Sequence, residues 1–595
     1  MKKLIYLSLA WALLACGNQQ EKTTETTVEV QDFEKFKSDF IDAMWQMNPI
    51  SASYQGVHDY DNQLPIPNEE RKQLQLQFAT DWLNKLRAFD YETLSEADKI
   101  DFHLIEDDLT NTEFYVNEFK GGEWNPSSYN LGGAFFQVIN YQKHPLEKRL
   151  ENVSEKLNHV EAYYAQAKQN IKQPTKVHTK LAVQQLEGSK SMFNQTMLDS
   201  LSKSSKDSAF KQEFAAKIEK PIAAINDYKK YLQTTFLDKA EDSTTFRSFR
   251  IGEELYSKKF AAEIQSAYSA KEIFQAAVAE KEDLHQKMYR LSEMLWEKYF
   301  GEQEKPGRIF EQIQMVINEV AKTHVHRDSF VTSIRQQIPE LVAFVNENDL
   351  ITLDPNKPLV VRETPEYMRG FAGASISAPG PYDADAETYY NVTPLDHYNE
   401  EEAESYLREY NNYTLQILNI HEAIPGHYTQ LVYSNQSPSL IKSIMGNGAM
   451  IEGWAVYTEK MMLEAGYGGD QIEMGLMYYK WNLRTVCNTI LDYGIQVLDY
   501  SEEDAMQLLM KEAFQEKSEA EGKWRRARLS QVQLCSYFTG YYEIMQLRSE
   551  LQEKMGADFD LKKFHEEFLS YGSAPVKYIR KLMLKKLAAS EKNAA

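Results

Sequence analysis

Apolar residues recur along most of this chain with the period of an α-helix. Between residues 284 and 299 the recurring residues are Leu284, Met288, Leu291, Leu295 and Tyr299, at spacings of four, three, four and four. Such a stripe lines one face of a long helix and is typical of a helix that packs on a core. Glycine and proline are sparse, 26 and 18 of 595 residues, which disfavours an all-β architecture. We therefore expect a mainly α protein, large enough to bury a sizeable core.

One stretch, residues 346–395, departs from the helical pattern. It contains short runs of β-forming residues at 359–361 and 389–393 and six prolines, Pro355, Pro358, Pro365, Pro379, Pro381 and Pro394. These features predict a small sheet or hairpin inserted into a helical protein. The insert would divide a helical N-terminal lobe, residues 32–345, from a helical C-terminal lobe, residues 396–595. A central cleft between two such lobes is the natural place for a ligand.

The first 16 residues have the features of a bacterial secretory signal peptide. Lys2 and Lys3 precede a mostly apolar run over residues 4–15, which is well short of the roughly 20 residues of a membrane-spanning helix. The run ends in Leu, Leu, Ala and Cys16, which resembles the lipobox of bacterial lipoproteins, where the cysteine carries acyl chains. We expect Cys16 to be the lipidated first residue of the mature chain. The alternative is a cysteine near an ordinary cleavage site.

Residues 17–31 are rich in Gln, Thr and Glu and offer little to bury, so we expect a disordered tether. Gly17, directly after the cysteine, resembles lipoproteins that are sent on to the outer membrane. This resemblance implies a protein of the bacterial cell envelope that meets a membrane only through its lipid anchor.

The chain is strongly acidic, with a formal net charge of -22 at pH 7. Such a surface is a poor match for nucleic acid or for anionic lipid, so we expect no nucleic-acid partner. Besides Cys16 there are only two cysteines, Cys487 and Cys535. Two distant thiols imply no disulfide framework, and they either pair or are both buried.

The sequence HEAIPGH at residues 421–427 places a His-Glu pair close to a second histidine. In the zinc-binding helix motif His-Glu-x-x-His, the two histidines are four residues apart and point at one metal ion while the glutamate addresses a water. Here His421 and His427 are six apart, which on an unbroken helix turns them about 240° away from each other. A regular helix therefore cannot bring both imidazoles to one metal ion.

Pro425 and Gly426 offer a way around this problem. Proline interrupts a helix, and glycine tolerates a left-handed backbone. If the chain loops out by two residues here, the histidines regain the relationship of an i, i+4 pair. The alternative is a helix end with two ordinary histidines.

A second helical segment begins near Met450 and contains Glu452 and Glu459. A His, His, Glu set leaves a fourth position open, as catalytic zinc requires, and Glu452 is a candidate for the third ligand. Glu459 lies seven residues further on, on almost the same helix face, and is a candidate to orient a ligand by a hydrogen bond. Exposed or ion-paired glutamates at this spacing are equally common.

The motif HEAIPGH is followed by EGWAVYTE at residues 452–459. With these two motifs the chain resembles the bacterial domain-of-unknown-function family 885, over residues 32–585. The layout of the motifs is also similar to that of helical zinc peptidases in which a glutamate is the third ligand. The resemblance implies zinc bound by His421, His427 and Glu452, with Glu422 as the general base. The chain departs from the expected pattern at Tyr428 and Gln496, where we expect histidines.

A late segment offers further candidates. Tyr537 and Tyr541 share a helix face, and related helical peptidases use a tyrosine from a comparable segment to stabilise the oxyanion. Arg525, Arg526 and Arg528 form a basic cluster that can clamp a substrate carboxylate. The alternative for this cluster is a solvated face paired with Glu519 and Glu521.

Together these features predict a zinc-dependent hydrolase, a peptidase that acts on oligopeptides at the bacterial cell envelope. An extended peptide would pair with an exposed strand edge, formed by residues 388–393 or by their hairpin partner at 373–377. The alternatives are a catalytically inactive envelope-tethered lipoprotein that binds peptides or proteins, and a lipoprotein that scaffolds other envelope proteins.

Overall fold

The computed structural model describes residues 32–239, 244–357, 359–364, 373–378, 380–383, 387–437 and 439–594. The signal peptide expected at 1–16, the lipidation of Cys16 and the tether at 17–31 lie outside the described residues. The described chain is mainly α-helical with one three-stranded sheet, so the predicted fold class is confirmed. Within the described ranges, no helix is both long enough and apolar enough to cross a bilayer.

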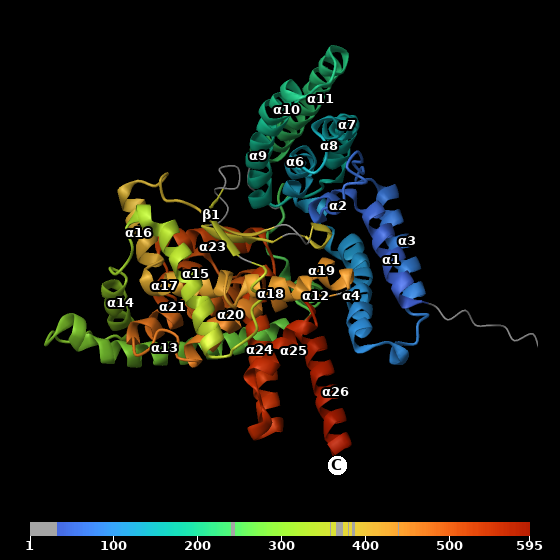
Figure 1. Ribbon diagram of the computed structural model, residues 1–595. Coiled ribbons are helices and arrows are strands. Elements are labelled where there is room, and N and C mark those ends of the chain that lie inside the picture. Colours follow the sequence, from blue (N-terminus) through green and yellow to red (C-terminus); the bar gives the residue numbers. More distant parts are fainter. Residues whose placement is uncertain are drawn as a thin grey trace, which may run out of the picture.

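The N-terminal part of the chain contains fifteen named α-helices (Figure 1). The first four are α1 (Phe33–Met47), α2 (Pro49–Gln55), α3 (Glu69–Leu86) and α4 (Glu96–Glu113). Then come α5 (Gly121–Trp124), α6 (Gly132–Asn140), α7 (Leu146–Leu157), α8 (Val160–Asn170), α9 (Lys176–Ser191), α10 (Met197–Lys203) and α11 (Ser208–Leu232). The last four are α12 (Gly252–Glu263), α13 (Ala270–Phe300), α14 (Ile309–Val320) and α15 (Phe330–Glu347). Helices α6 to α11 project from the rest of the molecule as a bundle (Figure 1).

The C-terminal part follows the sheet and is again helical. It consists of α16 (Glu400–Glu409), α17 (Asn412–Glu422), α18 (His427–Asn435), α19 (Leu440–Ile444), α20 (Gly448–Glu464), α21 (Ile472–Val497), α22 (Glu502–Met506), α23 (Lys517–Leu529), α24 (Ser536–Met555), α25 (Leu561–Ser570) and α26 (Val576–Ala594). In Figure 1, α17, α18 and α20 lie in the middle of the body, close to the sheet.

Buried apolar side chains form two separate cores. The smaller core lies mostly in the projecting bundle and includes Phe135, Tyr164, Phe193, Phe214 and Tyr228. The larger core joins α1 to α4 with the helices from α12 onward. It therefore draws side chains from both predicted lobes, 32–345 and 396–595, and the division into lobes at these residues stays a prediction.

The apolar stripe predicted for residues 284–299 lies in α13, as expected. Leu284, Met288 and Leu295 are buried, and Leu291 and Tyr299 pack against the same core. Helix α13 begins at a capping box between Ser269 and Glu272, a motif that satisfies two backbone donors at a helix start. It packs along α21, the helix that later provides a hydrogen-bond donor to the candidate site.

The predicted small sheet is present, with strands β1 (Leu359–Glu363), β2 (Ala374–Ser377) and β3 (Thr388–Val392). Strand β3 is central, parallel to β1 and antiparallel to β2. The prediction that residues 388–393 form an exposed edge is therefore wrong, because β3 is paired with a strand on both sides. Strand β2, from the 373–377 run, does lie at an edge. The Tyr390 hydroxyl of β3 donates to Asn419 of α17 at 2.9 Å, which ties the sheet to that helix.

Of the two alternatives for the cysteines, burial without pairing is the one observed. Cys487 and Cys535 are both free and buried. The Cys535 sulfur lies 3.0 Å from the hydroxyl of Tyr256. Neither thiol is therefore a structural crosslink.

Candidate metal centre

The helix that carries His421 is interrupted at the predicted place. Helix α17 ends at Glu422 and α18 begins at His427, with a tight turn and a cis Ile424–Pro425 peptide bond between them. The predicted looping out is thus confirmed, but the role expected for Gly426 is wrong. Its φ is -74°, which is not left-handed. Glycine is required because a Cβ here would lie 1.9 Å from the carbonyl oxygen of His421.

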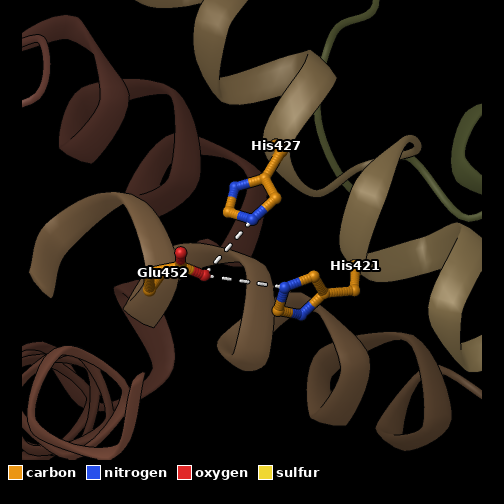
Figure 2. Close-up of side chains that lie close together, drawn as sticks. All are labelled: His421, His427 and Glu452. Atoms are coloured by element: carbon orange, nitrogen blue, oxygen red, sulfur yellow. Dashed lines mark ion pairs between the residues drawn. The ribbon is translucent and has the colours of Figure 1, made fainter. Parts of the chain in front are cut away.

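The turn brings the two histidines to one place (Figure 2). Their ring centroids are 4.7 Å apart and the rings are nearly perpendicular. Glu452 of α20 reaches the same place, with its Oε2 3.7 Å from Nε2 of His421 and 3.4 Å from Nε2 of His427. Two helix ends and a neighbouring helix therefore converge on one point.

The geometry of these three side chains fits a bound metal ion. One ligand atom from each lies within 4.8 Å of the others. A tetrahedral ion with bonds of about 2.0–2.1 Å holds neighbouring ligand atoms about 3.3 Å apart, close to the two histidine-to-glutamate distances. Among the described residues, this is the one group of His, Cys, Asp and Glu side chains with such spacing.

Helix α20, which presents Glu452, is fixed by a close helix crossing. A Cβ on Gly540 of α24 would lie 1.7 Å from the carbonyl oxygen of Ala449, and one on Gly453 would lie 2.3 Å from the carbonyl carbon of Gly540. The two glycines let the helix backbones touch. On the other side, Trp454 donates to the carbonyl of Pro425 at 3.0 Å. This bond ties α20 to the turn between the two histidines.

Glu459 lies behind His421, on the side away from Glu452. Its Oε1 lies 2.7 Å from Nδ1 of His421 and accepts from Nε1 of Trp481 at 3.0 Å. A carboxylate at Nδ1 keeps the proton on that nitrogen, so that Nε2 can bind a metal. Glu459 is fully buried, and this burial raises the pKa of its carboxyl.

The centre holds more carboxylates than cations. Glu422, Glu452 and Glu459 surround two imidazoles. Burial alone would lower the pKa of His421, but its contacts with Glu452 and Glu459 hold the pKa well above its ordinary value. Burial likewise opposes ionisation of Glu452, yet the two histidines hold its pKa well below the usual range. Such a cluster favours a bound cation, which would balance the buried negative charge.

The two candidate tyrosines lie in different surroundings. Tyr541 is buried and lines a cavity of about 340 Å³ together with Tyr478 and Lys460. Tyr537 is half-buried. No contact links either hydroxyl to His421, His427 or Glu452 among the described residues, so the oxyanion role stays a prediction for both.

Of the three arginines, Arg526 is the one that contacts a predicted catalytic residue. It donates to Gln533 at 2.6 Å and to the hydroxyl of Tyr537 at 3.3 Å. Arg525, one residue earlier, is exposed. The role of Arg525, Arg526 and Arg528 as a clamp for a substrate carboxylate stays a prediction.

Arg528 and Glu519 have other partners than those expected. The Arg528 guanidinium lies 4.8 Å from the centroid of the Trp524 ring. Glu519 pairs with Arg484 of α21 at 2.7 Å. Glu521 pairs with Lys517, so neither expected glutamate forms an ion pair with the cluster among the described residues, whereas Arg525 and Arg526 are exposed, as the solvated-face alternative expects.

Three residues that shape the centre were not predicted: Trp481, Gly453 and Gly540. Because glycine inside a helix costs stability relative to alanine, its presence there points to a packing or functional reason, so the two glycines left a detectable signal. Trp481 left none, because its contact with Glu459 joins separate helices.

Comparison with known proteins places the chain in a family. Residues 49–583 match the family described as "Bacterial protein of unknown function (DUF885)". The match spans most of the chain, so the protein belongs to this family and the resemblance to it inferred from the motifs is confirmed. The likeness to helical zinc peptidases stays a prediction. A search of the curated proteins finds no match.

Two solved structures share the fold. A candidate lipoprotein of unknown function from Shewanella oneidensis is 52% identical, with a TM-score of 0.88, and the match covers 93% of this chain and 100% of that one. A candidate lipoprotein from Colwellia psychrerythraea is 17% identical, with a TM-score of 0.76, covering 94% of this chain and 100% of that one. The second shows a shared fold alone.

Proposed function

We propose that this protein is a zinc-dependent hydrolase that cleaves oligopeptides at the bacterial cell envelope. The observation that carries the proposal is Glu422, next to His421 in sequence and in space. Among the described residues, its carboxylate has neither a hydrogen-bond donor nor an ion-pair partner, although it is near both histidines. A site that only binds a metal has no need for an unpaired carboxylate beside a ligand.

The ligand atoms favour zinc. Two imidazole nitrogens and one carboxylate oxygen, with a fourth position open, are the set that hydrolytic zinc sites use. His421, His427 and Glu452 would hold the ion. Zinc in such a site supplies an acidified water and polarises the substrate carbonyl.

The remaining steps fall to the side chains of the chain itself. Burial raises the pKa of the Glu422 carboxyl above its ordinary value, which improves its ability to hold a proton near neutral pH. Glu422 would take a proton from the attacking water on a free carboxylate oxygen and return it to the leaving amine. Glu459 would hold the His421 ring in place, and the hydroxyl of Tyr537 or of Tyr541 would donate to the developing oxyanion.

Strand β2 supports a peptide as the substrate. Thr393 donates its backbone N–H to the carbonyl of Gly373, so the hydrogen-bonded pairs with β3 fall at alternate residues from 373. The N–H groups of Ala374 and Ile376 therefore point away from β3, toward the free edge. An edge of this kind accepts an extended peptide through backbone hydrogen bonds.

The location at the envelope rests on the N-terminus and on the relatives. The lipobox ending at Cys16 predicts a lipid anchor, and the Shewanella oneidensis relative is described as a candidate lipoprotein. Both support a lipid-anchored protein of the bacterial cell envelope, and Gly17 favours the outer membrane.

The test is cleavage of a mixed peptide library, read by mass spectrometry. We expect cleaved oligopeptides with the parent protein and zinc, little action on folded proteins, and loss of cleavage by orders of magnitude in Glu422→Gln. That variant should keep its metal, because the amide preserves the shape but cannot take the proton. The exposed Glu400→Gln serves as control. Equal turnover by the Glu422 variant, or no cleavage by the zinc-loaded parent, would contradict the proposal.

A further inference from the structure

Two adjoining cavities lie apart from the metal centre. One, of about 590 Å³, lies between α1, α4 and the loop that leads into α20, and is lined by residues 444–448 of that loop. The other, of about 470 Å³, lies between α2, α3 and the projecting bundle. They share the lining residues Asn48, Ser51, Gln75, Tyr115 and Val116, so they form one continuous hollow. Each volume is in the range of small-ligand sites.

An unpaired carboxylate lies in the first cavity. Asp108 of α4 lines it, and among the described residues no side chain donates to its carboxylate or forms an ion pair with it. Its side chain is exposed to solvent. The neighbouring Glu263 differs, because it is paired with Lys259 and accepts from the Tyr115 hydroxyl. Asp108 is thus the anion in this cavity that is free to bind a cation.

An unpaired guanidinium lies in the second cavity. Arg71 of α3 lines it, and within the described part of the chain its side chain has no carboxylate partner. Other charges at this end are already paired, since Lys72 contacts Glu69 and Glu123 contacts Lys172. Lys120, which is exposed, adds a further cation. This end of the hollow therefore favours an anion, in a protein that is otherwise strongly acidic.

The wall between the two charges is polar. Asn48, Ser51 and Gln75 are common to both cavities, and Asn111 and Thr112 line the first. Amide and hydroxyl groups both donate and accept hydrogen bonds. These side chains can therefore bind the alternating N–H and C=O groups of a peptide backbone, and they suit such a ligand better than they would suit an apolar one.

From this arrangement we infer that the hollow binds a short free peptide by its two charged ends, with the ammonium group at Asp108 and the carboxylate at Arg71. One ligand class carries both charges on a chain of amide groups, and that class is the unblocked oligopeptide. None of His421, His427 and Glu452 lines the hollow. The inference goes beyond the proposed hydrolase and does not depend on it.

The test is calorimetric titration of the purified Glu422→Gln protein with Ala-Ala-Ala, since that background removes cleavage from the measurement. We expect binding that weakens about tenfold or more in Asp108→Asn and in Arg71→Gln, because each loses a charged hydrogen-bond partner. Peptides in which one terminal charge has been removed test the two ends of the hollow separately. The N-acetyl peptide should bind weakly and be insensitive to Asp108→Asn, and the C-terminal amide should be insensitive to Arg71→Gln.

The controls are Asp470→Asn and Arg290→Gln, both exposed and outside the hollow, and thermal unfolding checks that each variant is folded. Absence of tripeptide binding at millimolar concentration would overturn the inference. So would binding that ignores both Asp108 and Arg71 but disappears in His421→Ala, because the peptide would then lie at the metal centre. Failure of library cleavage with this binding pattern intact contradicts the hydrolase alone.

Discussion

The Oε1 atom of Glu459 lies 2.7 Å from Nδ1 of His421, and the same oxygen accepts from Trp481. The carboxylate thus links a helix at the back of the centre to a metal-facing imidazole. A carboxylate in this position fixes the ring orientation of a metal-binding histidine and determines which ring nitrogen carries the proton. We expect Glu459→Gln to weaken zinc affinity about 10- to 100-fold, measured by competition with a chelator.

The control for this variant is Glu464→Gln, on the same helix but paired with Arg548. It should bind zinc like the parent. Unchanged zinc affinity in Glu459→Gln would mean that the hydrogen bond to His421 has only a structural role.

The crossing of α20 and α24 gives a prediction about stability. In Gly540→Ala, the new Cβ would lie 1.7 Å from the Ala449 carbonyl oxygen, so the two helices must separate. We expect a loss of about 1–3 kcal/mol in unfolding free energy, as in other overpacked cores, together with weaker metal binding as Glu452 shifts. Thermal unfolding and metal analysis measure the two effects.

Gly522→Ala is the matched control, because a Cβ there has no heavy atom within 4 Å and alanine favours a helix. It should be neutral or stabilising by up to about 1 kcal/mol. If Gly540→Ala is as stable as this control, the close crossing does not hold Glu452 in place.

Asp492 gives a prediction about pH. It is buried and accepts the backbone N–H groups of Val532 and Leu534. Burial raises the pKa of its carboxyl from 3.8 to about 7, although both backbone bonds favour the charged form. Between these values the folded protein holds a proton that the unfolded chain has released. The contribution of Asp492 to stability is therefore full below the unfolded value and falls as the pH rises, by at most about 1.4 kcal/mol per pH unit.

Asn at this position cannot titrate. Urea unfolding at several pH values between about 4 and 8 should show a shallower fall in stability for Asp492→Asn than for the parent. Parallel pH profiles for the two proteins would show that Asp492 is not protonated in the folded state.

The free edge of β2 gives a prediction about substrate binding. Ala374→Pro removes an N–H that points away from β3, so the sheet should keep its own hydrogen bonds. We expect weaker binding of peptide substrates, seen as a higher KM, with unchanged metal content. Ala374→Gly keeps the N–H and is the control. If both variants have the KM of the parent, peptides do not pair with this edge.

The parts of the molecule that were predictable depend on local rules. The α13 stripe follows from helical period, and the break between His421 and His427 follows from Pro425 in a helical pattern. Local patterns also placed Glu459 on the face of Glu452, although only the structure shows that it contacts His421.

The parts that were not predictable depend on contacts between distant segments. Strand order cannot be read from the strands themselves, so β3 was mistaken for a possible edge. The use of Gly426 for close approach depends on a fold-back of the chain onto the His421 carbonyl. Trp481 and Arg484 reach their acidic partners across helix boundaries, which no sequence period records.

The central claim is that His421, His427 and Glu452 bind zinc, and metal analysis of the purified protein tests it most directly. We expect about one zinc per chain in the parent, since the three ligands form one site. The His421→Ala, His427→Ala double variant should lose most of it, because the remaining ligand cannot hold the ion alone, while the exposed His397→Ala should keep it. Full occupancy in the double variant, or no zinc in the zinc-treated parent, would contradict the account.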